Sequence, residues 1–176
     1  LIENRIASSI IRDCADIAEK FKISIYNETR NIGDLRRVLV RTADATGEVM
    51  VVLVIGSTYF KKKKLFTDEL LKRQPEITTL LINVNRRHDS MILGSDEGKK
   101  VTGNGYITDV ILGKKFRVSA DSFMQSNHEQ AEILYSEGAK DWIVIDPETG
   151  AASAKPQTIT VSALPNNGGY DRAAKV

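Results

Sequence analysis

Cysteine is nearly absent from this sequence, which has a single one, Cys14, among 176 residues. One cysteine cannot form an internal disulfide framework or supply a cysteine-rich zinc or iron–sulfur site. Histidine is scarce too, with only His88 and His128, and neither has a serine or cysteine at a spacing typical of a catalytic triad. The sequence therefore predicts no metal site and no triad nucleophile.

Long hydrophobic runs are also lacking. No stretch approaches the roughly 20 apolar residues that cross a bilayer, and the first residues lack the basic start and apolar core of a secretory signal. We therefore expect a cytoplasmic protein without a membrane partner. Because the chain begins with Leu1 and not with methionine, we also expect its natural start to lie upstream.

Loops that bind nucleotide phosphates are missing as well. There is no GxxxxGK[ST] sequence, and the G-x-G at Gly103 and Gly105 lacks the third glycine and the following helix of a dinucleotide-binding loop. This G-x-G therefore predicts a turn.

The composition is that of a globular protein, with 41% hydrophobic and 27% charged residues. The length allows one domain, or one domain and a fragment of another. A net charge of +2 does not point to nucleic acid, but basic residues gather in short clusters beside apolar runs: Arg36–Arg37, Lys61–Lys64, Arg86–His88, Lys99–Lys100 and Lys114–Arg117. Either they form a phosphate-binding surface after folding, or they are the solvated ends of strands and helices.

The periodicity of apolar residues predicts an α+β fold with a mainly antiparallel sheet and packed helices. Helical spacing predicts helices over residues 3–21 and 62–74, with Cys14 on the apolar stripe of the first and hence a buried thiol. Strands are predicted at residues 35–42, 48–55, 77–84, 90–93, 99–101, 106–111 and 115–118, and a further helix from Asn127. The first three strands should form one sheet, the first two as a hairpin.

The composition changes near residue 141. Residues 142–145 and 157–161 resemble strands, but the rest of this tail is rich in alanine, glycine, asparagine and proline. It has too few large apolar side chains to build a core of its own. We therefore divide the chain into a first domain over residues 1–139 and part of a second over residues 140–176.

One dense pattern carries a family resemblance. In residues 116–127, FRVSADSFMQSN, a strand leads into a polar turn with an aromatic ring and, two residues later, an amide. This segment resembles the F-x-I-S-P-x-S-F-F-Q-V-N motif of the S-adenosylmethionine-dependent RNA uracil 5-methyltransferases. Other matching segments, within residues 15–137 and in the same order, are Tyr26-Asn27-Glu28, Gly33 to Arg37, Val40-Arg41, Thr46 to Met50 and Gln130 to Tyr135.

The resemblance implies the central RNA-substrate domain of such an enzyme, followed by a fragment of its Rossmann-like α/β methyltransferase domain. Phe123 would stack on a uracil flipped out of its RNA, and Gln125 would pair with the uracil edge. Alternatively, the two residues have only structural roles, with Phe123 in the hydrophobic core and Gln125 in a turn. Arg36, Arg37 and Arg41 lie in basic, matching segments and are expected to bind RNA. The expected partner is ribosomal or transfer RNA.

The resemblance also exposes what is missing. The family's Gly-rich loop for S-adenosyl-L-methionine has no counterpart, so we do not expect this chain to bind that cofactor. Ala163 stands where the family has a cysteine nucleophile, whose thiolate must add to uracil before position 5 can take a methyl group. The chain itself should be inactive, either because it is a shortened relative or because residues of a larger enzyme are omitted between residues 135 and 141.

Two other classes stay open. The chain could be a non-catalytic RNA-binding module that kept the basic sheet, or a protein-interaction domain without a nucleic-acid role. Salt-dependent RNA binding would separate both RNA hypotheses from the third. Methyl incorporation would separate the enzyme from the RNA-binding module.

Overall fold

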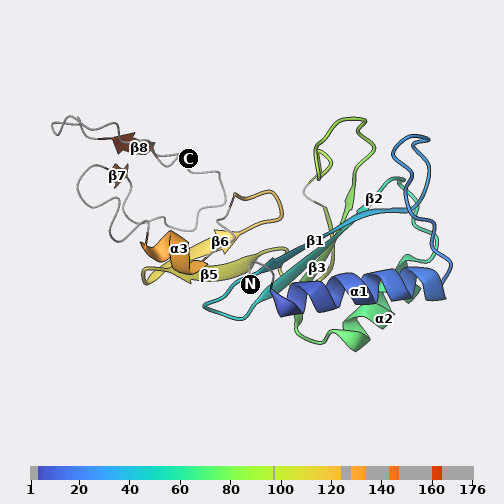
Figure 1. Cartoon of the computed structure of the whole chain (residues 1–176), viewed down its shortest axis with the longest axis horizontal. Coiled ribbons are helices and arrows are strands. Elements are labelled where there is room, and N and C mark those ends of the chain that lie inside the picture. Colours follow the sequence, from blue (N-terminus) through green and yellow to red (C-terminus); the bar gives the residue numbers. More distant parts are fainter. Residues whose placement is uncertain (1–3, 97, 124–127, 134–142, 147–159, 164–176) are drawn as a thin grey trace. The chain divides into compact units, whose positions relative to one another are not determined.

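A computed structural model describes residues 4–96, 98–123, 128–133, 143–146 and 160–163 of the chain (Figure 1). The chain divides into two compact units, one formed by residues 1–110 and 115–124 and the other by residues 111–114 and 125–176. The first unit holds the large sheet, and each unit is described by itself. The division falls earlier than the predicted domain boundary at residues 139 and 140, which stays a prediction.

The first unit is built on a four-stranded sheet. Its strands lie in the order β1 (Leu35–Thr42), β2 (Val49–Ile55), β3 (Ile77–Val84) and β4 (Lys99–Thr102). Strands β1 and β2 pair antiparallel, β2 and β3 parallel, and β3 and β4 antiparallel. The α+β class and the single sheet containing the first three predicted strands are confirmed.

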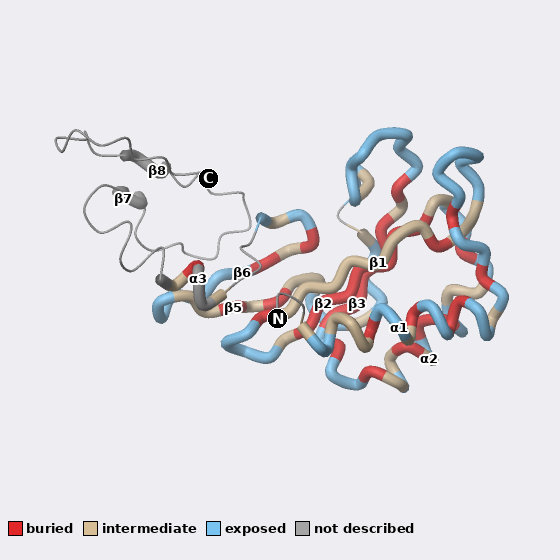
Figure 2. The backbone as a smooth tube through the Cα atoms, in the orientation of Figure 1, coloured by how far each residue is buried: buried red, intermediate tan, exposed pale blue. Residues whose placement is uncertain are grey.

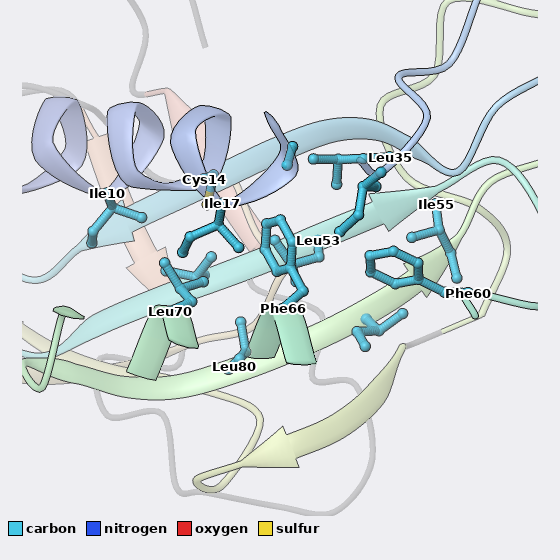
Figure 3. Close-up of a cluster of buried hydrophobic side chains, with 14 of the residues drawn as sticks. Ile10, Cys14, Ile17, Leu35, Leu53, Ile55, Phe60, Phe66, Leu70 and Leu80 are labelled. Atoms are coloured by element: carbon cyan, nitrogen blue, oxygen red, sulfur yellow. The ribbon is translucent and has the colours of Figure 1, made fainter. Parts of the chain in front are cut away.

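Two helices cover one face of this sheet. Helices α1 (Arg5–Lys20) and α2 (Lys63–Arg73) place Ile10, Ile17, Phe66 and Leu70 in one buried cluster with side chains of β2 and β3 (Figure 3). Cys14 lies in the same cluster and is 1% exposed. Burial, with Asp13 next to it, raises the pKa of this thiol to about 12. The predicted burial of this thiol is confirmed.

A hairpin covers the other face. Strands β5 (Ile107–Ile111) and β6 (Lys114–Val118) pair with each other. A second apolar cluster joins the sheet to this hairpin and the turn after it: Ala43, Met50, Val52, Val54, Leu81, Ile107, Val118 and Ala120. Figure 2 shows β2 and β3 as the most buried strands of the sheet.

The position of β2 explains its sequence. Every residue of β2 is buried, and its sequence, VMVVLVI, is a continuous apolar run. Val51 and Leu53 face the helices, whereas Val52 and Val54 belong to the cluster under the hairpin. A strand with neighbours on both edges and cover on both faces requires apolar side chains in both directions.

Some details differ from the sequence predictions. Residues 90–93 form an irregular loop, not a strand, because buried asparagines hold their backbone, as described below. The sheet is mixed, since α2 connects two parallel strands. Helix α3 (His128–Ile133) follows the predicted helix start at Asn127, which itself lies outside the described residues, as does the stretch 134–142.

The tail contributes two described strands. Strands β7 (Ile143–Asp146) and β8 (Thr160–Ala163) form a two-stranded antiparallel sheet. The predicted Ala163 is therefore the last residue of β8 and pairs with Ile143. Among the described residues, no helix is long and apolar enough to cross a membrane, and no three histidine, cysteine or acidic side chains gather as metal ligands would.

Candidate nucleic-acid interface

The turn after β6 presents an aromatic side chain to solvent. In residues Ser119 to Ser122, the backbone N–H of Ser119 donates to the Ser122 hydroxyl at 3.0 Å, and the two serine hydroxyls lie 2.7 Å apart. The Ser119 hydroxyl also donates to the carboxylate of Asp121. These bonds fix a short polar turn whose one apolar residue, Ala120, is buried.

Phe123 follows this turn and is 80% exposed, more than any other large hydrophobic side chain in the described part of the chain. The alternative in which Phe123 belongs to the core is therefore wrong here. Because water solvates an aromatic ring poorly, such a side chain is available for stacking on a ligand. Gln125, the second predicted contact with the base, lies outside the described residues.

Arg41 comes close to the same turn from a distant part of the sequence. It lies on β1, and its positive charge interacts with the carboxylate of Asp121. Burial lowers the pKa of Arg41, and Asp121 partly offsets this effect. The Nε atom of Arg41 is buried without a hydrogen-bond partner among the described atoms. The fold thus joins a predicted RNA-binding residue to the predicted base-binding turn.

Arg36 has a different environment. Its side chain is 1% exposed and forms a two-pronged ion pair with Glu28, with distances of 2.9 Å from Nε and 2.6 Å from Nη2. The guanidinium also lies 4.8 Å from the centre of the Tyr26 ring. The hydrogen bond from Arg36 lowers the pKa of Glu28 and raises that of Arg36. The geometry gives Arg36 a structural role, and its contact with RNA stays a prediction.

Arg36 and Arg37 also hold a loop. Arg36 donates to the carbonyl oxygens of Asn85 and Arg87 at 3.0 and 2.9 Å, and Arg37 donates to that of Met91 at 3.2 Å. The Arg37 side chain is 32% exposed and lies 3.5 Å from Glu28. Of the three predicted arginines, the structure brings only Arg41 to the Phe123 turn.

Two buried asparagines shape the same loop, and sequence reasoning missed them. The Asn85 amide donates to the carbonyls of Met91 and Ile92, and its oxygen accepts from the N–H of Arg87. The Asn83 side chain bridges Gly94 and Asp96 in the same way. The sequence does hold a signal for this loop, namely two asparagines at the end of an apolar strand. A buried side-chain amide needs hydrogen-bond partners, which a neighbouring loop can supply. The loop therefore presents Arg86 and Arg87 on a fixed backbone.

The segment Thr46 to Met50 binds strand β5 through hydrogen bonds. The Thr46 hydroxyl donates to the carbonyl of Thr108, and the Glu48 carboxylate accepts from the Thr108 N–H at 2.6 Å. Buried Asp109 accepts from the N–H of Ala45 at 3.2 Å. These bonds hold the β5–β6 hairpin, and so the Phe123 turn, on the sheet.

That this chain does not bind S-adenosylmethionine stays a prediction. One strand-to-helix connection in the first unit contains a glycine, Gly56, between β2 and α2. A Cβ at Gly56 would lie 2.2 Å from the Tyr26 ring, so this glycine makes room for a side chain. The G-x-G at Gly103 and Gly105 has positive φ angles of 75° and 86° and connects two strands, as predicted for a turn.

The sequence is similar to bacterial RNA methyltransferases. A protein of Bacillus cereus named "Uncharacterized RNA methyltransferase" is 38% identical over 135 residues, which are 77% of this chain and 29% of the relative. One of Enterococcus faecalis with the same name is 38% identical over 120 residues, 68% of this chain and 26% of the relative. This chain belongs to the RNA methyltransferase family. It spans less than a third of the length of these two relatives.

The fold of this family member also matches a solved structure. The crystal structure of Pyrococcus abyssi tRNA (uracil-54, C5)-methyltransferase in complex with S-adenosyl-L-homocysteine superposes with a TM-score of 0.59 and 22% identity. The match covers 77% of this chain and 31% of that one. It supports the fold that the motifs predict.

A family model also matches the tail of this RNA methyltransferase family member. The model described as "BACON: Putative binding domain, N-terminal" matches residues 131–176. These residues include α3 in part, β7 and β8, and the antiparallel pairing of β7 with β8 differs from the parallel pairing typical of a Rossmann-like domain. The assignment of residues 140–176 to a methyltransferase domain stays a prediction.

Proposed function

We propose that this chain is the substrate-binding part of an RNA (uracil-5-)methyltransferase, acting on ribosomal or transfer RNA in the cytoplasm. It binds RNA, and a flipped uracil stacks on the ring of Phe123 and pairs with the amide of Gln125, while Arg41 contributes to RNA binding. The family's methyl donor is S-adenosyl-L-methionine, which other parts of a complete enzyme would have to bind.

The observation that carries this proposal is the exposed ring of Phe123 on a fixed turn. An enzyme that modifies a base takes the base out of its stack and holds it against an aromatic face. Ser119 and Ser122 fix the backbone directly before Phe123, so this backbone loses little freedom when a base arrives. Arg41 adds positive charge beside it, which suits the neighbouring phosphates.

Replacing Phe123 by alanine should weaken binding of a uridine-containing RNA hairpin by roughly 5- to 150-fold, since base stacking on an aromatic ring contributes about 1 to 3 kcal/mol. The dissociation constant is measured by fluorescence anisotropy. Tyr59→Ala is the matched control, because Tyr59 is 70% exposed on another loop and should have no effect.

The uracil itself is tested with an RNA whose target uridine is abasic. Wild-type affinity should fall to that of Phe123→Ala, and the variant should not distinguish the two RNAs. Wild-type affinity should also fall steeply between about 50 and 200 mM salt. Binding that ignores salt would favour a protein-interaction domain instead.

The purified chain should form no 5-methyluridine from labelled S-adenosylmethionine. Ala163 offers no thiolate, and Ala163→Cys should not restore activity because the sequence lacks the family's Gly-rich cofactor loop. Calorimetric titration should detect no binding of the cofactor. Methyl incorporation above the level of a no-protein control would contradict this prediction.

A second candidate is a non-catalytic RNA-binding module. Ala163 favours it, and so does the match of residues 131–176 to a family described as a binding domain. For this candidate, adding the missing catalytic segments of a relative to residues 1–139 would not produce activity. For the first candidate, such a chimera would methylate uridine.

A further inference from the structure

The β5–β6 hairpin carries positive charges without ion-pair partners. Six cations in or near the sheet and helices of the described part form ion pairs with carboxylates, namely Lys20, Arg36, Arg37, Lys64, Arg73 and Arg87. Lys115 and Arg117 of β6, like Lys100 of β4, are exposed and make no ion pair with any described residue. Unpaired cations gathered on one surface attract a polyanion.

Two of these cations lie at Tyr106 or at the residue before it. The guanidinium of Arg117 lies 3.7 Å from the centre of the Tyr106 ring, close enough for stacking. The stem of Lys100 packs at Gly105, the residue before Tyr106, where a Cβ would lie 3.0 Å from Cδ of the lysine.

The alternation of β6 turns this group outward. Val118 points into the cluster under the hairpin and is 4% exposed. Side chains of a strand alternate between its two faces, so Arg117 and Lys115 both point away from that cluster. Tyr106, Lys100, Lys115 and Arg117 therefore form one surface, here called the hairpin patch.

The shape of the hairpin patch suits a nucleotide. The Arg117 guanidinium lies over the Tyr106 ring, and because the side chain is exposed it can also contact a second flat partner. Unpaired RNA bases stack on arginine planes as well as on aromatic rings, and lysines meet the phosphates. An acidic protein would use the charges but would gain nothing from a flat, stacked guanidinium.

We infer that the hairpin patch binds a second base of the RNA, a nucleotide flanking the target uridine, which stacks on Arg117 while Lys100 and Lys115 hold its phosphates. This inference rests on the proposed function. Arg117 and Phe123 are six Cα-to-Cα steps apart, so their backbones lie at most about 21 Å apart, and the Ser119–Ser122 turn shortens the path. One RNA strand can therefore reach both positions.

The test uses the purified chain and a fluorescent uridine-containing RNA hairpin. Arg117→Lys keeps the charge and removes the flat plane, so affinity should fall about five- to tenfold with an unchanged salt dependence. Lys115→Ala should instead reduce the slope of log affinity against log salt by about one. Lys72→Ala, an exposed lysine on α2, is the control and should change affinity little.

Abasic substitutions then locate the contact. In a series of RNAs with one abasic site each, one flanking position should weaken the wild type as much as Arg117→Lys does, and combining the two changes should have no further effect. The inference is wrong if Arg117→Lys binds as tightly as wild type, or if its effect depends in the same way on an abasic site at every position. In either case the proposed function stands as long as Phe123→Ala still weakens binding. Competition by polyglutamate as effective as by RNA would assign the patch to an acidic protein partner and overturn it too. A wild-type chain that does not bind RNA would overturn both.

Discussion

Phe66→Ala should lower the free energy of unfolding by about 3 to 5 kcal/mol, the largest effect on stability expected here. Phe66 is fully buried on α2 and packs in the cluster between the helices and the sheet (Figure 3). Its ring centre lies 5.9 Å from that of Phe60. The substitution would leave a cavity that the surrounding strand side chains cannot fill without leaving their positions.

Urea unfolding followed by circular dichroism measures this loss. Leu65→Ala is the matched control, because Leu65 precedes Phe66 on the same helix but is 54% exposed. It should change the free energy of unfolding by less than about 1 kcal/mol. Equal effects of the two substitutions would show that α2 does not pack on the sheet as described.

Arg36→Met should lower the free energy of unfolding by about 2 kcal/mol at neutral pH. The methionine fills much of the buried volume but cannot donate to the carbonyl oxygens of Asn85 and Arg87, which accept hydrogen bonds from the charged group. The loop after β3 should then exchange its amide hydrogens faster. Arg12→Met, which replaces an exposed arginine on α1, should have little effect.

The pH dependence of the free energy of unfolding measures how much the Arg36–Glu28 ion pair contributes to this effect. Arg36 lowers the pKa of Glu28 below its ordinary value of about 4.3. A carboxyl group with a lowered pKa stabilises the fold above its unfolded pKa, and this stability is lost as pH falls through the folded pKa. The stability difference between wild type and Arg36→Met should therefore become smaller in strongly acidic solution by the share of the Glu28 pair, whereas the share of the carbonyl hydrogen bonds should remain. A difference that does not change between neutral pH and pH 3 would contradict the pairing.

The same variant separates two roles of Arg36. If Arg36 only holds the loop, Arg36→Met should leave the salt dependence of RNA binding unchanged even where affinity falls. A direct phosphate contact would reduce the slope against log salt by about one. The near-complete burial of the side chain favours the first outcome.

The secondary structure was largely predictable from the sequence, since local patterns carry it. The apolar stripe with Cys14 predicts α1, and the glycine-containing gap between residues 42 and 48 predicts the β1–β2 hairpin. The loop at residues 90–93 was not predictable in this way. Its apolar residues resemble a strand, but the amide of Asn85 binds the backbone carbonyls that a strand would have paired.

The candidate site was predictable only in part. The motif around Phe123 marks a polar turn after a strand, and the exposure of Phe123 agrees with a binding role. The arginines could not be sorted from sequence, because clustered arginines look alike until their partners are known. In the folded protein, Arg36 forms an ion pair with Glu28 and hydrogen bonds to a loop. Arg41 interacts with the charge of Asp121, and Arg117 lies over the Tyr106 ring.

The sequence by itself determined the elements of this protein, its α+β class and its resemblance to RNA methyltransferases, because these depend on residue types at short spacing. Only the tertiary structure decided which charges are available to a ligand. Availability depends on partners that lie far apart in the chain, such as Arg36 and Arg87 or Tyr106 and Arg117. Desolvation and pairing are properties of the packed surface, so a cluster of basic residues acquires its function only when the sheet and hairpin bring its neighbours together.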